Sequence, residues 1–81
     1  MSTHRLILRV VALAVLIGRD PGLHIRLDSD LVSRRHGQLT FSYFDWLIED
    51  FNSSNGTFVS DQKISEATLI FPQQEVRIGN V

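Results

Sequence analysis

Apolar and polar residues alternate in short runs along most of the chain. Leu39, Phe41 and Tyr43 alternate with polar neighbours, so one face of this segment can pack on a core while the other meets water. Beyond Gly18, no stretch keeps apolar residues at helical spacing for more than two turns. The pattern therefore predicts short strands and almost no helix.

Turn-forming residues separate these runs at regular intervals. Strands are predicted over residues 24–27, 38–43, 46–48, 57–59, 64–71 and 76–78, with reversals at 20–22, 44–45, 52–56 and 60–63. Pro72 forbids ladder bonding where it stands. Strands this close together predict an all-β fold, an antiparallel sandwich or barrel.

An apolar run at residues 6–17 resembles the core of a signal peptide. Arg9 interrupts the run, no small-x-small cleavage site follows it, and it is too short to span a bilayer. Its β-branched residues favour extended backbone. We therefore expect a buried strand or strand pair here, and because the run has no internal turn residue, it can also extend as one long strand.

Composition narrows the classes of function. The 81 residues, 43% of them hydrophobic, suit a single domain over residues 1–81. Lys and Arg number 8 against 9 Asp and Glu, so no uniform positive field predicts a nucleic-acid or membrane partner. With no Cys and only scattered His, we expect no disulfide, metal site or cofactor. We expect the protein in the cytoplasm.

Polar residues concentrate in three predicted loops, at residues 18–20, 33–37 and 53–57. Loops separated by an even number of antiparallel strands emerge at the same end of a sandwich, so these three can share one surface. That surface would carry guanidinium forks, hydroxyls and one amide, from Arg19, Arg34, Arg35, Ser33, Ser54 and Asn55. Such a set fits a phosphate ester beside a peptide backbone.

Each feature also has an ordinary structural explanation. Asn55-Gly56 is a common hairpin turn, and Gly18 can simply ease a bend. Ser33 and His36 could pair as nucleophile and base, but no Gly-x-Ser-x-Gly elbow and no acidic orienting residue accompany them. We therefore expect no enzyme activity.

The order of the motifs resembles the signature of the forkhead-associated (FHA) domain. The motifs are Gly18-Arg19, then Ser33-x-x-His36-Gly37, then Ser54-Asn55-Gly56-Thr57. The longer segments LIGRDPGLHIRLDSDLVSRRH, WLIEDFNSSNGTFV and EVRIG follow the family pattern in the same order, from about Leu16 to Gly79.

The resemblance implies a β-sandwich with its recognition loops at one end, which binds phosphothreonine peptides made by a Ser/Thr kinase. It implies that Arg19 and Ser33 contact the phosphate, helped by Arg34, and that Asn55, joined by Ser54, holds the peptide backbone. It assigns structural support of the site to Gly18, His36 and Gly56. The role of Arg35 stays open, and the family's threonine preference implies a small pocket for the γ-methyl group.

The chain also departs from the family pattern. Gln73-Gln74 stands where Gly-Asp is usual, and Asp61-Gln62 stands near an expected Asn-Gly, so two hairpins should differ. Family members normally continue beyond Val81 into a closing strand. An open edge and the long N-terminal run predict self-association as a homodimer, by strand exchange or edge pairing. A structural or self-association module without phosphopeptide binding is the alternative function.

Overall fold

The computed structural model describes residues 13–81, which form eight strands in two sheets and contain no helix. No described residue therefore belongs to a helix able to cross a membrane. The strands are β1 (Leu13–Gly18), β2 (Ile25–Arg26), β3 (Gly37–Ser42), β4 (Asp45–Asp50), β5 (Thr57–Val59), β6 (Gln62–Lys63), β7 (Thr68–Ile70) and β8 (Val76–Ile78).

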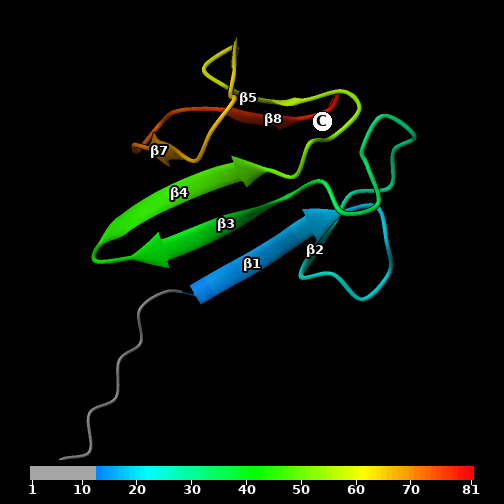
Figure 1. Ribbon diagram of the computed structural model, residues 1–81, viewed down its shortest axis with the longest axis horizontal. Coiled ribbons are helices and arrows are strands. Elements are labelled where there is room, and N and C mark those ends of the chain that lie inside the picture. The colour runs from blue at the N-terminus through cyan, green and yellow to red at the C-terminus, as the bar shows by residue number, and fades with distance from the viewer. Residues whose placement is uncertain (1–12) are drawn as a thin grey trace, which may run out of the picture.

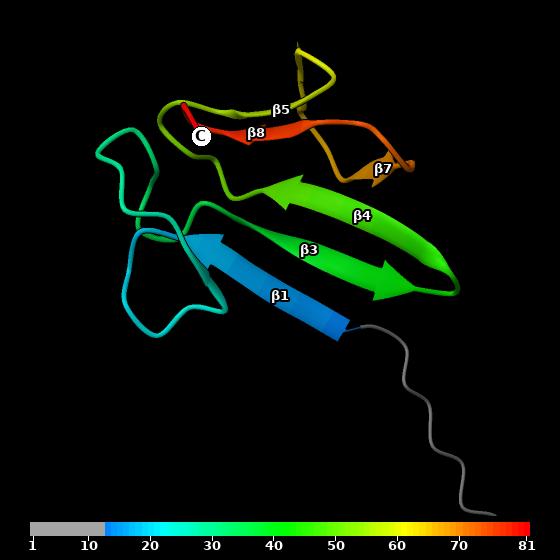
Figure 2. The same ribbon diagram turned by 180° about the vertical axis from the view of Figure 1, so that it is seen from behind.

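The larger sheet has the order β2-β1-β3-β4-β7 and the smaller has the order β6-β5-β8. Figure 1 shows β1, β3 and β4 side by side, with β5 and β8 in a second layer near the end where β4 terminates. Figure 2 shows the same two layers from behind. The all-β fold predicted from the strand pattern, and the β-sandwich implied by the resemblance, are confirmed. One pairing differs from the antiparallel expectation, because β2 runs parallel to β1.

The alternation in the sequence sets the register of the larger sheet. Val15 on β1, Leu39 on β3 and Ile48 on β4 lie opposite one another across the three strands. Because side chains alternate between faces, residues two apart on each strand share this face. Ile48 is completely buried, so this face is the one that packs against the smaller sheet.

The core lies where the two sheets overlap. Its buried apolar members come from both sheets and from the loop between β2 and β3: Ile17, Val32, Ile48, Val59 and Ile78. Val32 belongs to that loop and is nevertheless fully buried. Burying a Val side chain stabilises a fold by about 1.5–3 kcal/mol, so Val32 anchors the loop that carries Ser33.

Two hairpin tips have positive φ, and one of them differs from its predicted reversal. Tyr43 and Phe44, rather than Phe44-Asp45, form the turn between β3 and β4, and both have positive φ, 51° and 70°. Ser60 and Asp61 form the tip between β5 and β6 in the same way, with φ of 48° and 66°. Both are two-residue turns of the kind that favours Asn-Gly. Tyr43-Phe44 lacks that signal, which is why the first reversal was placed one residue too late, whereas Ser60-Asp61 lies within the reversal predicted at residues 60–63.

Smaller differences concern strand limits. The strand predicted at residues 24–27 is only β2, the turn predicted at 60–63 contains β6, and the strand predicted at 64–71 is reduced to β7. Of the apolar run at 6–17, β1 accounts for the part from Leu13 onward. The remainder of the expected N-terminal strand lies outside the described residues.

Candidate functional site

The three polar loops meet at one end of the sandwich, on the right in Figure 1 and on the left in Figure 2. The Arg19 N–H donates to the Ser33 carbonyl at 3.0 Å, and the Asp20 N–H donates to the Arg34 carbonyl at 3.2 Å. The Ser54 N–H donates to Ser33 Oγ at 3.1 Å. Ser33 therefore contacts both other loops and lies at the centre of the site.

Arg19 is held so that its two terminal nitrogens remain available. Its Nε donates to the carbonyl of Val32 at 3.1 Å, and Val32 is the buried anchor of the loop. Arg26 Nε in turn donates to the Arg19 carbonyl at 3.0 Å. No hydrogen bond or ion pair within residues 13–81 engages the Nη atoms of Arg19, so a pre-oriented fork of N–H donors is left for an anion.

Ser33 is placed to donate a hydrogen bond outward. Its N–H donates to His36 Nδ1 at 3.0 Å, and its Oγ already accepts the Ser54 N–H. A hydroxyl has one donor and two lone pairs. With the carbonyl and N–H both engaged in the loop framework, the Ser33 O–H is the group that remains for a ligand.

His36 is fully buried beneath the loops. Because Nδ1 accepts the Ser33 N–H, the ring proton sits on Nε2, which donates to the Gly56 carbonyl at 2.8 Å. The ring thus joins the β2–β3 loop to the β4–β5 loop. Both nitrogens form hydrogen bonds with backbone groups and neither bonds Ser33 Oγ, an arrangement unlike a nucleophile and its base.

Asp50 organises the β4–β5 loop, and the sequence interpretation missed it. Asp50 Oδ2 accepts the Ser53 N–H at 2.9 Å, and Oδ1 accepts the Thr57 hydroxyl at 2.7 Å and the Ser53 hydroxyl. Oδ1 also lies 3.5 Å from His36 Nε2. An acceptor three residues before a Ser, as in Asp50-x-x-Ser53, is the local signal that could have predicted this turn.

The ionisation of Asp50 reflects these contacts. Partial burial acts to raise the pKa of the carboxyl, but the hydrogen bonds from Ser53 and Thr57, with a smaller contribution from His36, outweigh burial and hold the pKa below 3.8. The carboxylate is therefore charged at neutral pH and keeps the loop ordered.

Asn55 and Ser54 lie exposed at the tip of the β4–β5 loop. Asn55 Nδ2 donates to the Leu31 carbonyl at 3.0 Å, which fixes the amide plane and leaves its other N–H and its Oδ1 for a ligand. Gly56 follows with φ of 85°, a left-handed conformation that a β-carbon disfavours. The backbone at Gly56 thereby presents the Asn55 amide outward.

Gly18 is required by a close approach of two loops rather than by its dihedral angles. A β-carbon built at Gly18 would lie 2.1 Å from the Arg34 carbonyl oxygen, closer than any real contact. The approach allows the backbone bonds of Arg19 and Asp20 to the neighbouring loop. Gly18 thus determines how near Arg19 comes to Ser33.

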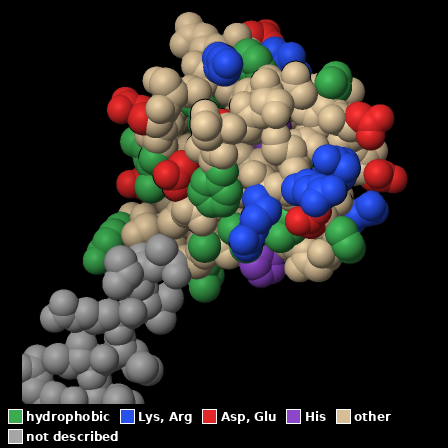
Figure 3. All heavy atoms as spheres, turned by 45° about the vertical axis from the view of Figure 1, so that its right-hand side comes forward, with side chains coloured by type: hydrophobic (Ala, Val, Ile, Leu, Met, Phe, Trp, Pro, Cys, Tyr) green, Lys and Arg blue, Asp and Glu red, His purple; other side chains and the backbone are tan. Residues whose placement is uncertain are grey.

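Arg34 and Arg35 are both exposed. The Arg34 carbonyl accepts the Asp20 N–H, and neither arginine side chain has a bond or ion pair within the described part of the chain. Figure 3 shows Lys and Arg side chains gathered on the face turned forward, with acidic side chains between them. The site is locally cationic although the formal net charge of the chain is −1.

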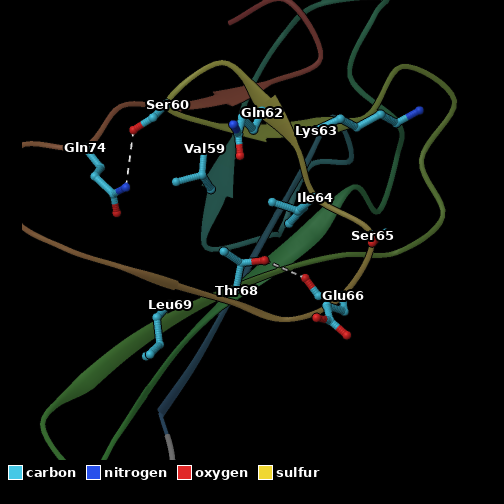
Figure 4. A pocket seen from close by; sticks show the side chains of 10 residues that line it. All are labelled: Val59, Ser60, Gln62, Lys63, Ile64, Ser65, Glu66, Thr68, Leu69 and Gln74. Carbon is cyan, nitrogen blue, oxygen red and sulfur yellow. Dashed lines mark hydrogen bonds between the residues drawn. The ribbon is translucent and has the colours of Figure 1, made fainter.

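One hollow in the described structure contains none of the predicted site residues. It lies between the β5–β6 hairpin and β7, and its wall includes Ser60, Lys63, Glu66, Thr68 and Gln74. Figure 4 shows that hydroxyl and amide groups there bond one another, as in the pair Gln74 and Ser60. Residues 13–81 also contain no group of three or more His, Asp or Glu that could hold a metal. The unengaged Nη atoms of Arg19 and the Ser33 hydroxyl make the three-loop site a surface suited to an anion.

Comparison with known proteins agrees with this geometry. The family model of the FHA domain matches residues 15–79. The chain belongs to the FHA family. The resemblance inferred from the motif order is therefore confirmed, and the match includes every residue that this FHA domain contributes to the three-loop site.

Individual relatives are similar over the same region. The FHA domain-containing protein FhaB of Mycobacterium tuberculosis (strain ATCC 25618 / H37Rv) is 37% identical over 65 residues, which are 80% of this chain and 42% of FhaB. This FHA domain thus spans about two fifths of that curated relative.

Two solved structures extend the comparison. Mycobacterium tuberculosis EmbR in complex with a low-affinity phosphopeptide is 35% identical, with a TM-score of 0.77 over 80% of this chain and 17% of EmbR. The N-terminal FHA domain of Rad53p from S. cerevisiae, in complex with a phosphothreonine peptide, is 25% identical, with a TM-score of 0.75 over 83% of this chain and 56% of the other.

Proposed function

We propose that this FHA domain binds phosphothreonine-containing proteins or peptides and thereby mediates phosphorylation-dependent protein–protein interactions. The observation that carries the proposal is the pairing of Ser33 and Arg19. Ser33 Oγ has one lone pair occupied by the Ser54 N–H, and the Arg19 Nε is tied to Val32. The two residues are joined by a backbone hydrogen bond, and the Ser33 O–H and the Arg19 Nη atoms make no hydrogen bond as donors within the described residues.

The remaining residues take roles that follow from their positions. Arg34 is exposed and adds positive charge to the phosphate site. Asn55, with its amide plane fixed by Leu31, both donates to and accepts from the peptide main chain, and Ser54 adds a hydroxyl beside it. Gly18, His36 and Gly56 hold the loops in this arrangement.

The choice of phosphothreonine rests on family membership. EmbR was solved with a phosphopeptide and Rad53p with a phosphothreonine peptide. A Ser/Thr kinase would supply the ligand. FHA domains are interaction modules, and the absence of turnover in this chain stays a prediction, as does its location in the cytoplasm.

The proposal is tested by calorimetric titration with a phosphothreonine peptide selected from a library and with its unphosphorylated copy. We expect binding only of the phosphorylated peptide. If no library member outcompetes its unphosphorylated copy, the alternative of a purely structural module replaces the proposal.

Arg77→Ala is the matched control for the arginines of the site. Arg77 belongs to β8, where its guanidinium stacks 4.1 Å from the centre of the Phe58 ring, outside the three loops. Its removal should leave phosphopeptide affinity unchanged. An equal loss of affinity in Arg77→Ala and Arg19→Ala would indicate a general effect of charge rather than a site.

A further inference from the structure

Arg26 lies beside the recognition loops, although the sequence motifs did not single it out. In the register of the parallel strand pair, Arg26 on β2 lies opposite Gly18 at the end of β1, and Gly18 directly precedes Arg19. The Arg26 Nε donates to the Arg19 carbonyl at 3.0 Å. A second guanidinium group is therefore fixed next to the backbone of the arginine that the phosphate site requires.

The terminal nitrogens of Arg26 are only weakly engaged. Within residues 13–81, their ion pair joins Nη2 to Asp28 Oδ1 at 3.7 Å, and the side chains of Arg26 and Asp28 are 48% and 80% exposed. An exposed ion pair contributes between nothing and about 1 kcal/mol. A carboxylate from a ligand can therefore replace Asp28 at little cost.

Arg26 differs in this respect from Arg34 and Arg35. Both of these are exposed, and no ion pair or hydrogen bond within the described part of the chain orients their side chains. Ordering a free arginine side chain costs conformational entropy. Because its Nε bond already orients the guanidinium, Arg26 loses less freedom on binding, and its planar fork can bond a carboxylate through two parallel N–H groups.

The guanidinium groups of Arg19 and Arg26 have separate anchors. Arg19 Nε donates to the Val32 carbonyl, whereas Arg26 Nε donates to the carbonyl of Arg19 itself. Under the proposed function, the Arg19 fork and the Ser33 hydroxyl bind the phosphate. Two separately anchored forks suit two anionic groups of one ligand, a phosphate and a carboxylate near it.

We propose that Arg26 is a specificity-determining residue of this FHA domain and binds the carboxylate of an Asp or Glu close to the phosphothreonine. The inference rests on the proposed function, because the phosphate must bring the peptide to the site. On binding, Arg26 exchanges Asp28 for the carboxylate of the ligand. The preferred ligands are therefore phosphothreonine peptides with an acidic flanking residue.

Calorimetric titration with matched peptides tests this inference. A phosphothreonine peptide with Ala at its flanking positions is compared with peptides in which Asp occupies, in turn, each of the three positions on either side. The wild-type protein should bind Asp at one or two of these positions more tightly than Ala by about threefold to tenfold, between the strength of an exposed ion pair and that of a charge-assisted hydrogen bond.

Two substitutions should change this preference in opposite directions. Arg26→Gln should abolish the preference for Asp over Ala, and a melting curve checks that the variant folds. Asp28→Asn removes the competing carboxylate and should increase the preference, but not when it is combined with Arg26→Gln. Arg77→Gln, outside the three loops, is the matched control and should keep the wild-type preference.

The ratio of the two affinities separates the possible outcomes. If Arg26→Gln weakens the Asp and Ala peptides by the same factor, Arg26 only positions Arg19, and the inference is wrong. It is also wrong if the wild type binds the Ala peptide and prefers Asp at no position, a result that leaves the proposed function intact. Loss of the preference in Arg77→Gln would indicate a general effect of charge. If no phosphothreonine peptide binds, the proposed function fails and the role of Arg26 fails with it.

Discussion

The two ends of the larger sheet are built in opposite ways. At the recognition end, backbone and side-chain hydrogen bonds join three loops, and His36 and Thr57 are polar residues buried completely. At the other end, the β3–β4 hairpin exposes Tyr43 and Phe44 at its tip. Within residues 13–81, no buried side-chain polar atom is left without a partner. The site is therefore a hydrogen-bonded polar framework, while the tip of the β3–β4 hairpin exposes large apolar side chains.

We expect the largest effect on stability from His36→Ala, a substitution at the recognition end. His36→Ala leaves the Ser33 N–H and the Gly56 carbonyl without their partners in a buried position, and each such loss costs about 1–3 kcal/mol. We expect a clearly lower melting temperature and weaker phosphopeptide binding together. Thermal unfolding measures the first effect and calorimetry the second.

His24→Ala is the control for His36. His24 is exposed, and its Nδ1 accepts only the Leu16 N–H at the edge of β1. A melting temperature for His36→Ala no lower than that of His24→Ala would contradict the role of the buried ring as the link between two loops.

Arg19→Ala should affect binding and leave the fold intact. The Nη atoms have no partner within the described residues, and the single Nε bond goes to a loop that Val32 anchors independently. A charge-assisted bond contributes about 1.5–3 kcal/mol, so affinity should fall roughly tenfold to a hundredfold or more. Calorimetry with the phosphothreonine peptide measures the affinity, and a melting curve measures the stability. Unchanged affinity would contradict the assignment of Arg19 to the phosphate site.

Acid should destabilise the folded protein through Asp50 at the recognition end. The pKa of Asp50 is below 3.8 in the folded protein. The stability that this carboxylate contributes is therefore complete above the pKa of Asp50 in the unfolded chain, and it is lost as the pH falls through the pKa of Asp50 in the folded protein. Asp50→Asn should reduce this dependence of unfolding free energy on pH below about pH 4. Urea unfolding at a series of pH values measures it, and an unchanged slope in the variant would contradict the role of Asp50.

The smallest predicted change in unfolding free energy comes from Phe44→Gly, at the far end of the larger sheet. Phe44 adopts φ of 70° and is 92% exposed, so Phe44→Gly should relieve backbone strain without loss of packing. We expect a gain of about 1 kcal/mol or less in unfolding free energy, with unchanged phosphopeptide affinity. Chemical unfolding measures the gain, and a destabilised variant would show that the exposed ring contributes to folding.

The sequence predicted the recognition end better than the far end, and the reason is physical. Strand alternation and turn residues located β3, β4, β5 and β8, and strand parity allowed the three loops to share one surface. The turns at Tyr43-Phe44 and Ser60-Asp61 adopt positive φ without the residues that favour it, so tertiary pairing determines them. Val32 carries no local signal of burial, since its role depends on which loop the second sheet covers.

The measurement closest to the central claim follows the phosphate itself. Phosphorus NMR of a phosphothreonine peptide, titrated with acid, reports the second pKa of the phosphate, about 6 when free. If Arg19 and Ser33 bind the dianion, the bound peptide should titrate at a clearly lower pH, and Arg19→Ala should move the midpoint back toward that of free peptide. A bound phosphate that titrates like the free peptide would contradict the account.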